Sequence, residues 1–314
     1  MPRRQKAEPA AVGSSGTKPL SEVIGEMAVV ACVQATSLGM TKLDKQASEQ
    51  SDAQHNAKRG TGKVNVVRLP GAELAVASLK AVQRRARLLL ASYTTQWGAD
   101  RRLLPNVFIG DFAGEFDKLR REHDELRDNF VANAQSYIAA ARQNLGSYQV
   151  LPPDEDEIAL AFTLGFDLQP VPDVKNYEIG NKELEAQLKA RFERDIQASF
   201  VEAQKDLLRR LAEPLENLIE RMKQYDARER RKKKTKVADK AGTFKETVVT
   251  NITDIAKIFS AFNLTGDPLL TRIAEQLDAF DGIEHKDLTR SKDLRDDCAR
   301  RAADIRGMLG QWLD

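Results

Sequence analysis

One short run of residues in this chain has the types and spacing that bind a polyanion. Seven of the nine residues from 228 to 236 are cationic: Arg228, Arg230, Arg231, Lys232, Lys233, Lys234 and Lys236. Such a run repels itself, and it attracts a polyanion because neutralised phosphates release their counterions. No aromatic residue lies between Tyr225 and Phe244 to stack on a base. The run therefore predicts contact with the phosphate backbone of DNA or RNA, without readout of the base sequence.

The same composition also fits a solvated connection between two helices, and this alternative stays open. The formal net charge of the whole chain is only +2, so its overall charge does not demand a nucleic-acid partner. Both interpretations place a charged linker at residues 227–242.

A second candidate lies where one helical pattern stops and the next begins. Residues 97–106 contain Trp97, Arg101 and Arg102 and end in Pro105-Asn106. We expect a structural corner, in which Trp97 is buried and Pro105 ends the loop. The alternative is a ligand-binding corner formed by Trp97, Arg101 and Arg102.

Residue types that commonly perform catalysis or hold metals are sparse. The histidines are His55, His123 and His285, and none has a second His or a Cys at the spacing of a zinc site. His123 lies on an apolar stripe, which is typical of a packed, hydrogen-bonded core histidine. Cys32 and Cys298 show no ligand spacing and indicate a reduced setting. We therefore expect no catalytic residue, no metal and no cofactor, and hence a protein that is not an enzyme.

Two other motifs are expected to be structural. Residues 60–63 read Gly-Thr-Gly-Lys, like part of a phosphate-binding loop. That loop requires Gly where this chain has Ala57, and Ser or Thr where it has Val64. The acidic residues 154–157 are expected to form a solvated turn before a strand.

The longest regular pattern is an apolar stripe that predicts one long helix. Its members recur on average every 3.8 residues, near the helical period: Leu184, Leu188, Phe192, Ile196, Phe200, Ala203, Leu207, Leu211, Leu215, Leu218 and Met222. Pro214 interrupts this stripe, and a proline inside a helix costs roughly 3 kcal/mol. We therefore expect a bend near residues 211–214, with Glu213 in a turn. The stripe packs within one chain or, alternatively, forms a coiled coil in a homo-oligomer.

Shorter patterns complete a mainly α fold with a small β-sheet (α+β), in which long helices pack as an elongated bundle. Helical periodicity predicts helices at residues 72–96 and 112–145, and three more after residue 243. The second of these three opens at Asp267-Pro268, an N-cap residue followed by proline. Three β-prone runs predict the strands of one sheet: residues 27–36, 63–68 and 158–168.

These elements divide the chain into four parts. They are a disordered basic tail at residues 1–19, an α+β domain at 20–226, the basic linker at 227–242 and a C-terminal helical bundle segment at 243–314. Within the α+β domain, residues 41–58 form either a weak surface helix or a loop.

Residues 94–106, which read TTQWGADRRLLPN, resemble an uncharacterised family of bacteriophage and prophage proteins. In that family a Thr-x-Pro-Trp segment precedes an Arg-x-Leu-Pro segment, and in this chain Gln96 replaces the first proline. The similarity continues in order through Leu145-Gly146, residues 170–173 and Asp267-Pro268-Leu269. The family has no assigned reaction, so the resemblance implies a phage origin and a location in the host cytoplasm.

Together these features predict a non-enzymatic phage accessory protein that oligomerises and contacts nucleic acid through its basic run. The alternative is a protein-interaction or scaffold module that binds a host or phage protein, with the basic run as an inert linker. An enzyme with a site around Trp97 and Arg101 is the third class. No membrane partner is expected, because the longest apolar stretch, residues 27–33, is too short to span a bilayer.

Overall fold

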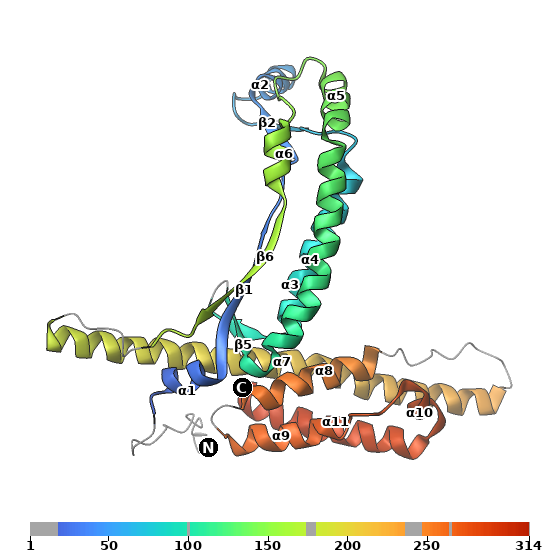
Figure 1. The fold of residues 1–314 in the computed structure, drawn as a ribbon. Coiled ribbons are helices and arrows are strands. Elements are labelled where there is room, and N and C mark those ends of the chain that lie inside the picture. Colours follow the sequence, from blue (N-terminus) through green and yellow to red (C-terminus); the bar gives the residue numbers. More distant parts are fainter. Residues whose placement is uncertain (1–17, 99–100, 174–179, 236–246, 264–265, 314) are drawn as a thin grey trace.

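The computed structural model describes residues 18–98, 101–173, 180–235, 247–263 and 266–313. It shows a mainly helical α+β fold, in which an upright arm rises from an elongated base (Figure 1). The basic tail predicted for residues 1–19 lies outside the described residues, apart from Lys18 and Pro19. No helix in the described ranges is long and apolar enough to cross a membrane.

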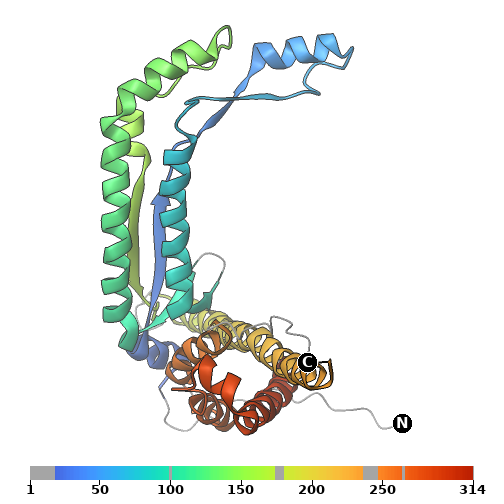
Figure 2. The same ribbon diagram turned by 90° about the vertical axis from the view of Figure 1, so that its right-hand side faces the viewer.

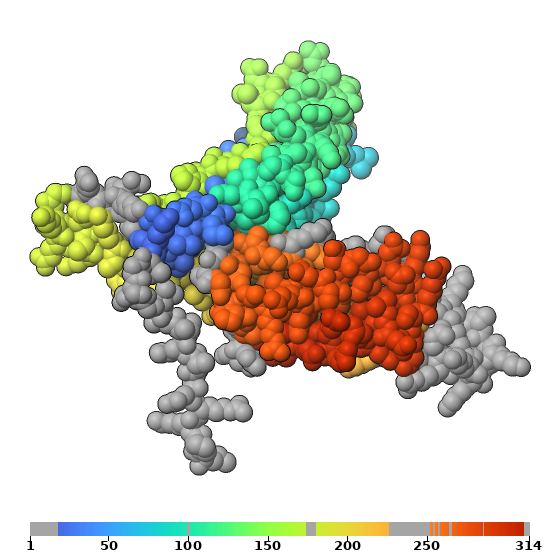
Figure 3. Space-filling model, turned by 60° about the horizontal axis from the view of Figure 1, so that its bottom comes forward, coloured from blue at the N-terminus to red at the C-terminus, as the bar shows by residue number. Residues whose placement is uncertain are grey.

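The base is organised around helix α7 (Lys182–Thr235), which has 54 residues. Helices α8 (Thr247–Phe262) and α11 (Lys292–Leu313) pack along it. Helix α9 (Pro268–Asp278) packs against these two, and α10 (His285–Arg290) packs against α11. The predicted stripe of α7 is buried from Ile196 to Met222, whereas Leu184, near its start, is 43% exposed. Seen from below, the C-terminal helices form one surface, and the first part of α7 protrudes from it (Figure 3). The prediction of one long helix with a buried stripe is therefore confirmed.

The prediction that Glu213 lies in a turn is wrong, because α7 is helical through Glu213 and Pro214. A bend near Pro214 stays a prediction. Leu211, Leu215 and Leu218, on either side of the proline, are fully buried in the base. Their burial outweighs the hydrogen bond that the proline ring removes from the helix. Tertiary packing thus keeps the helix continuous where local propensity would end it.

The arm consists of a long β-ribbon covered on one face by two helices. Strands β1 (Ala28–Thr36) and β6 (Thr163–Pro170) form the ribbon, and α3 (Glu73–Tyr93) and α4 (Ile109–Ala132) lie against it (Figure 2). The arm core between the two layers contains eight buried residues: Ala31, Val82, Ala86, Leu90, Leu104, Phe112, Phe116 and Leu164. Alternate side chains of each strand thus face the helices.

At the foot of the arm, a short hairpin joins the ribbon to form one antiparallel sheet. Its strands are β4 (Thr95–Trp97) and β5 (Arg101–Pro105), and the strand order is β4-β5-β1-β6. Helix α1 (Leu20–Met27) precedes β1 and packs against α7. The 3-10 helix η1 (Asn106–Phe108) leads from β5 into α4. Sequence periodicity did not indicate β4, β5 or α1, which are all short.

The tip of the arm has a core of its own and a second sheet. Strands β2 (Thr41–Asp44) and β3 (Val64–Val67) pair with each other, and α2 (Lys45–Gln54) follows β2. Helices α5 (Ala134–Leu145) and α6 (Glu155–Ala161) complete the tip. The strand predicted at residues 63–68 therefore exists, but it does not join the sheet of the other two predicted strands.

Local capping explains two further differences from the sequence predictions and decides the open alternative at residues 41–58 in favour of a helix. Asp154 accepts a hydrogen bond from the amide of Glu157 (2.7 Å), so residues 155–161 form α6 and the strand begins only at Thr163. Asp44 caps α2 in the same way, through the amide of Ala47 (2.9 Å). The helix predicted over residues 112–145 divides at Asn133, whose side-chain amide donates to the carbonyl of Asn129 (2.8 Å).

We predict that Pro214→Ala stabilises the base. Alanine restores the amide donor that proline lacks and removes a clash with the preceding turn, so the free energy of unfolding should rise by about 1–3 kcal/mol. Urea denaturation followed by circular dichroism measures this change. The neighbouring Glu213→Ala serves as the matched control, and its effect should stay within about 0.5 kcal/mol. A lower stability for Pro214→Ala would show that the proline ring contributes packing that we have not recognised.

Candidate functional site

The basic run begins on helix α7 and not in a linker. The helix continues to Thr235, so residues 228–234 are helical, which corrects the linker start predicted at residue 227. The side chains of Arg228, Arg230, Arg231, Lys232, Lys233 and Lys234 lie outside the described residues, as does the whole of Lys236. The run belongs to a helix whose earlier part is anchored in the base.

The described side chains of α7 are packed in the base up to Tyr225, shortly before this run. Met222 is 2% exposed, and the ring of Tyr225 lies 4.7 Å from the guanidinium of Arg295. The Tyr225 hydroxyl also donates to the carbonyl of Thr289 (3.4 Å). The last part of α7 then extends past α10 and α11 (Figure 1). The last side chains of α7 that the structure describes are thus still packed in the base, three residues before the cationic sequence starts.

The second candidate, the corner at residues 97–106, is the joint between arm and base. Trp97 ends β4 and is 9% exposed, in the same core as the buried stripe of α7. The prediction that Trp97 is buried is confirmed. Arg102, on β5, is half-buried and donates to both the hydroxyl (2.6 Å) and the carbonyl oxygen (3.2 Å) of Thr94.

Sequence reasoning missed the α7 residues that complete this joint. Arg210 donates to the same Thr94 carbonyl (2.7 Å). Asp206 accepts from the Thr95 hydroxyl and the Gln96 amide (both 3.2 Å), and its carboxylate lies 3.8 Å from Arg102. The only available signal was Asp206 and Arg210 four residues apart on one helix, and this spacing does not reveal a partner on another element.

The joint contains more positive than negative charge. Two arginines share one carboxylate, and burial lowers the pKa of both Arg102 and Arg210, while Asp206 opposes this effect. The neighbouring Arg210 cation lowers the pKa of Arg102 further. Both guanidiniums lie at the C-terminal end of α3, where backbone carbonyl groups that have no partner within the helix favour positive charge. The arrangement stabilises the joint and offers no group for chemistry.

The structure does not bring the three predicted corner residues into one site. Trp97 belongs to the base core, Arg102 contacts Thr94, and the exposed Arg101 donates to the side chain of Gln169 (2.8 Å). Each of the three side chains contacts a different part of the protein. A shared ligand site therefore stays a prediction, and these contacts do not support it.

Two buried polar side chains, Gln83 and His123, lie between the arm core and the tip. His123 is fully buried, and its Nε2 lies 3.3 Å from Nε2 of Gln83. Gln83 also donates to the carbonyl oxygens of Thr36 (2.7 Å) and Thr163 (3.2 Å), so it ties α3 to both strands of the ribbon. Burial lowers the pKa of His123, and the nearby Asp124 opposes this shift. The prediction of a packed, hydrogen-bonded core histidine is confirmed.

The glycine loop at residues 60–63 does not offer its amides to a phosphate. The amides of Gly60 and Gly62 both donate to the carboxylate of Asp52 (2.7 Å each), which is 5% exposed. A Cβ on Gly62 would meet Asp52 Oδ1 at 2.9 Å, so a larger residue at this position would require the Asp52 side chain to shift. An internal carboxylate occupies the place that a phosphate takes in a phosphate-binding loop.

The described residues contain no group of three or more His, Cys, Asp or Glu side chains that could hold a metal ion. Cys32 and Cys298 are both free thiols. Burial raises the pKa of Cys298 to about 11, so this thiol stays protonated at neutral pH and is a poor nucleophile.

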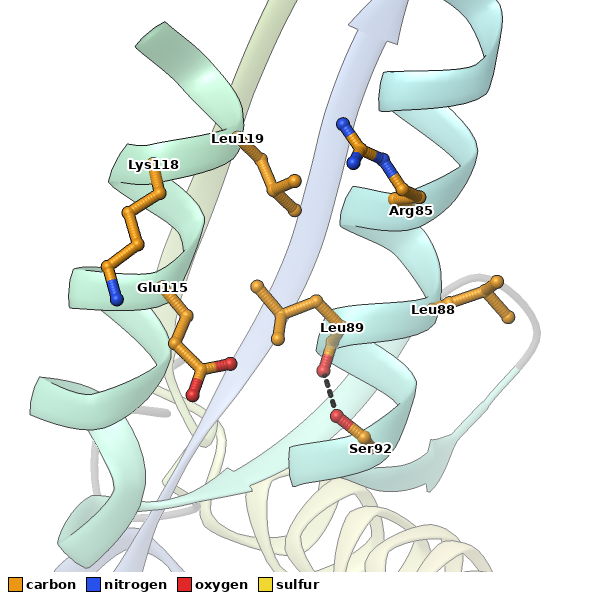
Figure 4. A pocket seen from close by; sticks show the side chains of 7 residues that line it. All are labelled: Arg85, Leu88, Leu89, Ser92, Glu115, Lys118 and Leu119. Carbon is orange, nitrogen blue, oxygen red and sulfur yellow. Dashed lines mark hydrogen bonds between the residues drawn. The ribbon is translucent and has the colours of Figure 1, made fainter. Parts of the chain in front are cut away.

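An open groove runs between α3 and α4 on the side away from the ribbon. Leu89 and Leu119 point toward each other across it, and Glu115 and Lys118 flank it on α4 (Figure 4). Leu88 lies beside them and is 63% exposed. The groove is apolar at its centre and charged at its rims, which suits a contact with another protein better than a reaction.

We predict that Arg102→Ala weakens the joint, whereas Arg101→Ala does not. Removing Arg102 deletes two hydrogen bonds from a half-buried cation, so the free energy of unfolding should fall by about 1–3 kcal/mol. Arg101 is exposed, and its loss should cost less than about 0.5 kcal/mol. Equal effects of the two substitutions in chemical denaturation would contradict the role assigned to Arg102.

We also predict that His123 makes the arm less stable in acid. The pKa of this group is below its ordinary value of 6.5 in the folded chain. The unfolded chain therefore binds a proton first as the pH falls below about 6.5, and stability falls by at most about 1.4 kcal/mol per pH unit. Denaturation at pH 7 and pH 5 should show a smaller difference for His123→Gln than for the native chain. The exposed His55→Gln is the control and should leave the difference unchanged.

No protein-family model matches the chain, and no curated protein or solved structure matches it either. The similarity of residues 94–106 to phage proteins therefore stays a prediction.

Proposed function

We propose that the protein is a non-enzymatic, oligomerising phage accessory protein that contacts nucleic-acid phosphates through the basic end of α7. The observation that carries the proposal is the position of residues 228–234 on α7, directly after its last packed residues. The base holds the middle of this helix, from Ile196 to Met222, and the cationic end extends past its helical neighbours (Figure 1). A cationic helix fixed in this way loses less conformational freedom on binding than a flexible linker does.

The chemistry of the run supports contact with the phosphate backbone and not with bases. Consecutive cationic residues on a helix leave no apolar side that could pack against the chain. The run has no aromatic neighbour for stacking, so binding should be independent of base sequence and sensitive to salt. A phage origin and a location in the host cytoplasm belong to this proposal through the resemblance of residues 94–106 alone.

A second candidate function, a protein-interaction or scaffold module, is favoured by a separate observation. Five large apolar side chains at the tip of the arm are between 36% and 78% exposed: Leu43, Val67, Tyr148, Leu151 and Leu160. Exposed apolar side chains that gather in one region are typical of contacts between proteins. Under this alternative the tip binds a host or phage protein, and the basic run has no partner.

A charge-removal variant distinguishes the two functions. We expect replacement of Arg230, Arg231, Lys232, Lys233 and Lys234 by Gln to weaken binding to duplex and single-stranded DNA of any sequence. It should also flatten the dependence of the dissociation constant on salt, because fewer counterions are released. Fluorescence anisotropy with labelled oligonucleotides, at about 50 and 200 mM salt, measures both effects.

The matched control replaces five exposed cations of the base by Gln, at Arg221, Lys223, Arg272, Lys286 and Arg290. It removes the same charge but should keep most of the binding. Circular dichroism should show both variants folded, since exposed charges contribute little to stability. Unchanged binding by the α7 variant, or no binding by the native chain at about 50 mM salt, would exclude the nucleic-acid function and leave the interaction module.

A further inference from the structure

We propose that the groove side of the arm binds a second copy of this chain, with α3 of one copy against α4 of the other. The proposed function includes oligomerisation, and this inference identifies the surface that mediates it. It rests on the oligomerisation part of the proposed function alone. It does not depend on nucleic-acid binding.

Helix α3 is strongly cationic. Its 21 residues contain Lys80, Arg84, Arg85 and Arg87 but only one acidic residue, Glu73, which gives a net charge of +3. Lys80, Arg84 and Arg87 are exposed, and their spacing of four and three residues places them along one side of the helix. None of these three forms an ion pair within the described part of the chain, so a line of cations faces solvent without a partner.

The adjacent helix α4 carries the opposite charge. It has seven acidic and four cationic residues, which gives a net charge of −3. Asp117, Glu125 and Asp128 lie on its solvent side. Two of them pair with arginines of the same helix, Arg120 and Arg127, at 3.1 and 2.9 Å. Exposed pairs of this kind contribute little stability, so these carboxylates are free to take new partners.

An apolar groove lies between the two lines of charge. The ribbon covers one face of the helix pair, and the groove with Leu88, Leu89 and Leu119 occupies the other (Figure 4). An apolar centre with charged rims is the usual composition of a contact between proteins. The exposed Leu88 supplies apolar area that solvent now covers.

Two-fold symmetry makes the two charged lines complementary. When two helix pairs meet face to face, α3 of each copy lies over α4 of the other, and the attractive contact occurs twice. Such a contact is closed and self-complementary, as in most homodimers. The resulting dimer has four helices at its centre and a β-ribbon on each outer side.

A nucleic acid is a weaker occupant of the same surface. Packed helices lie about 8–10 Å apart, which is about one Debye length at physiological salt. A polyanion on α3 therefore also experiences the negative α4, whereas a second copy presents a partner of the correct sign to each helix. The observations favour the second copy.

A charge exchange between two variants tests this proposal. The first variant carries Lys80→Glu, Arg84→Glu and Arg87→Glu, so both of its helices become negative. The second carries Asp117→Lys, Glu125→Lys and Asp128→Lys, so both become positive. Sedimentation velocity should show the native chain as a dimer of 35.0 kDa subunits at low salt, each variant alone as a monomer, and an equimolar mixture of the two as a dimer again.

Three controls make the result decisive. Reversal of three exposed base cations, Arg272, Lys286 and Arg290, should leave the native dimer intact. Leu88→Asp should weaken the dimer while the unfolding curve of the monomer stays unchanged, because this side chain is already exposed. Denaturation curves should show that all variants fold.

The remaining outcomes overturn the inference. A native chain that is monomeric at every salt concentration has no such dimer. An oligomer that both charge variants retain associates through another surface. A first variant that keeps its oligomeric state but loses oligonucleotide binding shows that α3 is a polyanion site. In each case the separate test of residues 230–234 still decides the proposed nucleic-acid function.

Discussion

The carbonyl oxygen of Thr94 accepts hydrogen bonds from Arg102 and Arg210, which belong to the sheet and to α7. This oxygen ends α3, so one acceptor connects the helix of the arm, the sheet at its foot and the long helix of the base. Asp206 balances part of the positive charge, and Trp97 closes the base core beside it. The direction of the arm relative to α7 therefore depends on a few half-buried polar contacts, supported by apolar packing on both sides.

Helical periodicity predicted the main elements because long helices with one buried side leave a clear pattern. The stripe of α7 and the cap at Asp267, which accepts from the amide of Leu269 (2.8 Å), are examples. Short elements and interruptions were less visible. Pro214 indicated a break that burial of Leu211 and Leu215 prevents, while Asn133 ends a helix through a side-chain bond that periodicity does not contain. Local signals failed where tertiary packing or a single cap decides the outcome.

The same limit applies to the candidate sites. The composition of residues 228–236 was readable without a structure, but the helical conformation of residues 228–235 was not, because helix propensity and charge repulsion oppose each other there. Arg102 was singled out for a ligand corner, but it donates to Thr94, and the carboxylate beside it, Asp206, lies more than 100 residues away on α7. The opposite charges of α3 and α4 form one surface because the two helices lie side by side. No single segment of the sequence specifies that arrangement.

Because α7 is continuous, its parts differ in how well they tolerate a change in length. A straight helix of 54 residues is about 80 Å long, and each residue added turns everything beyond it by about 100°. Before Tyr225 such a turn would carry the apolar stripe out of the core. After Tyr225 the helix has cationic residues on consecutive positions, so rotation changes little and only reach changes. Length variation is therefore tolerable in the last two turns of α7 and intolerable between Ile196 and Met222, where the stripe is buried.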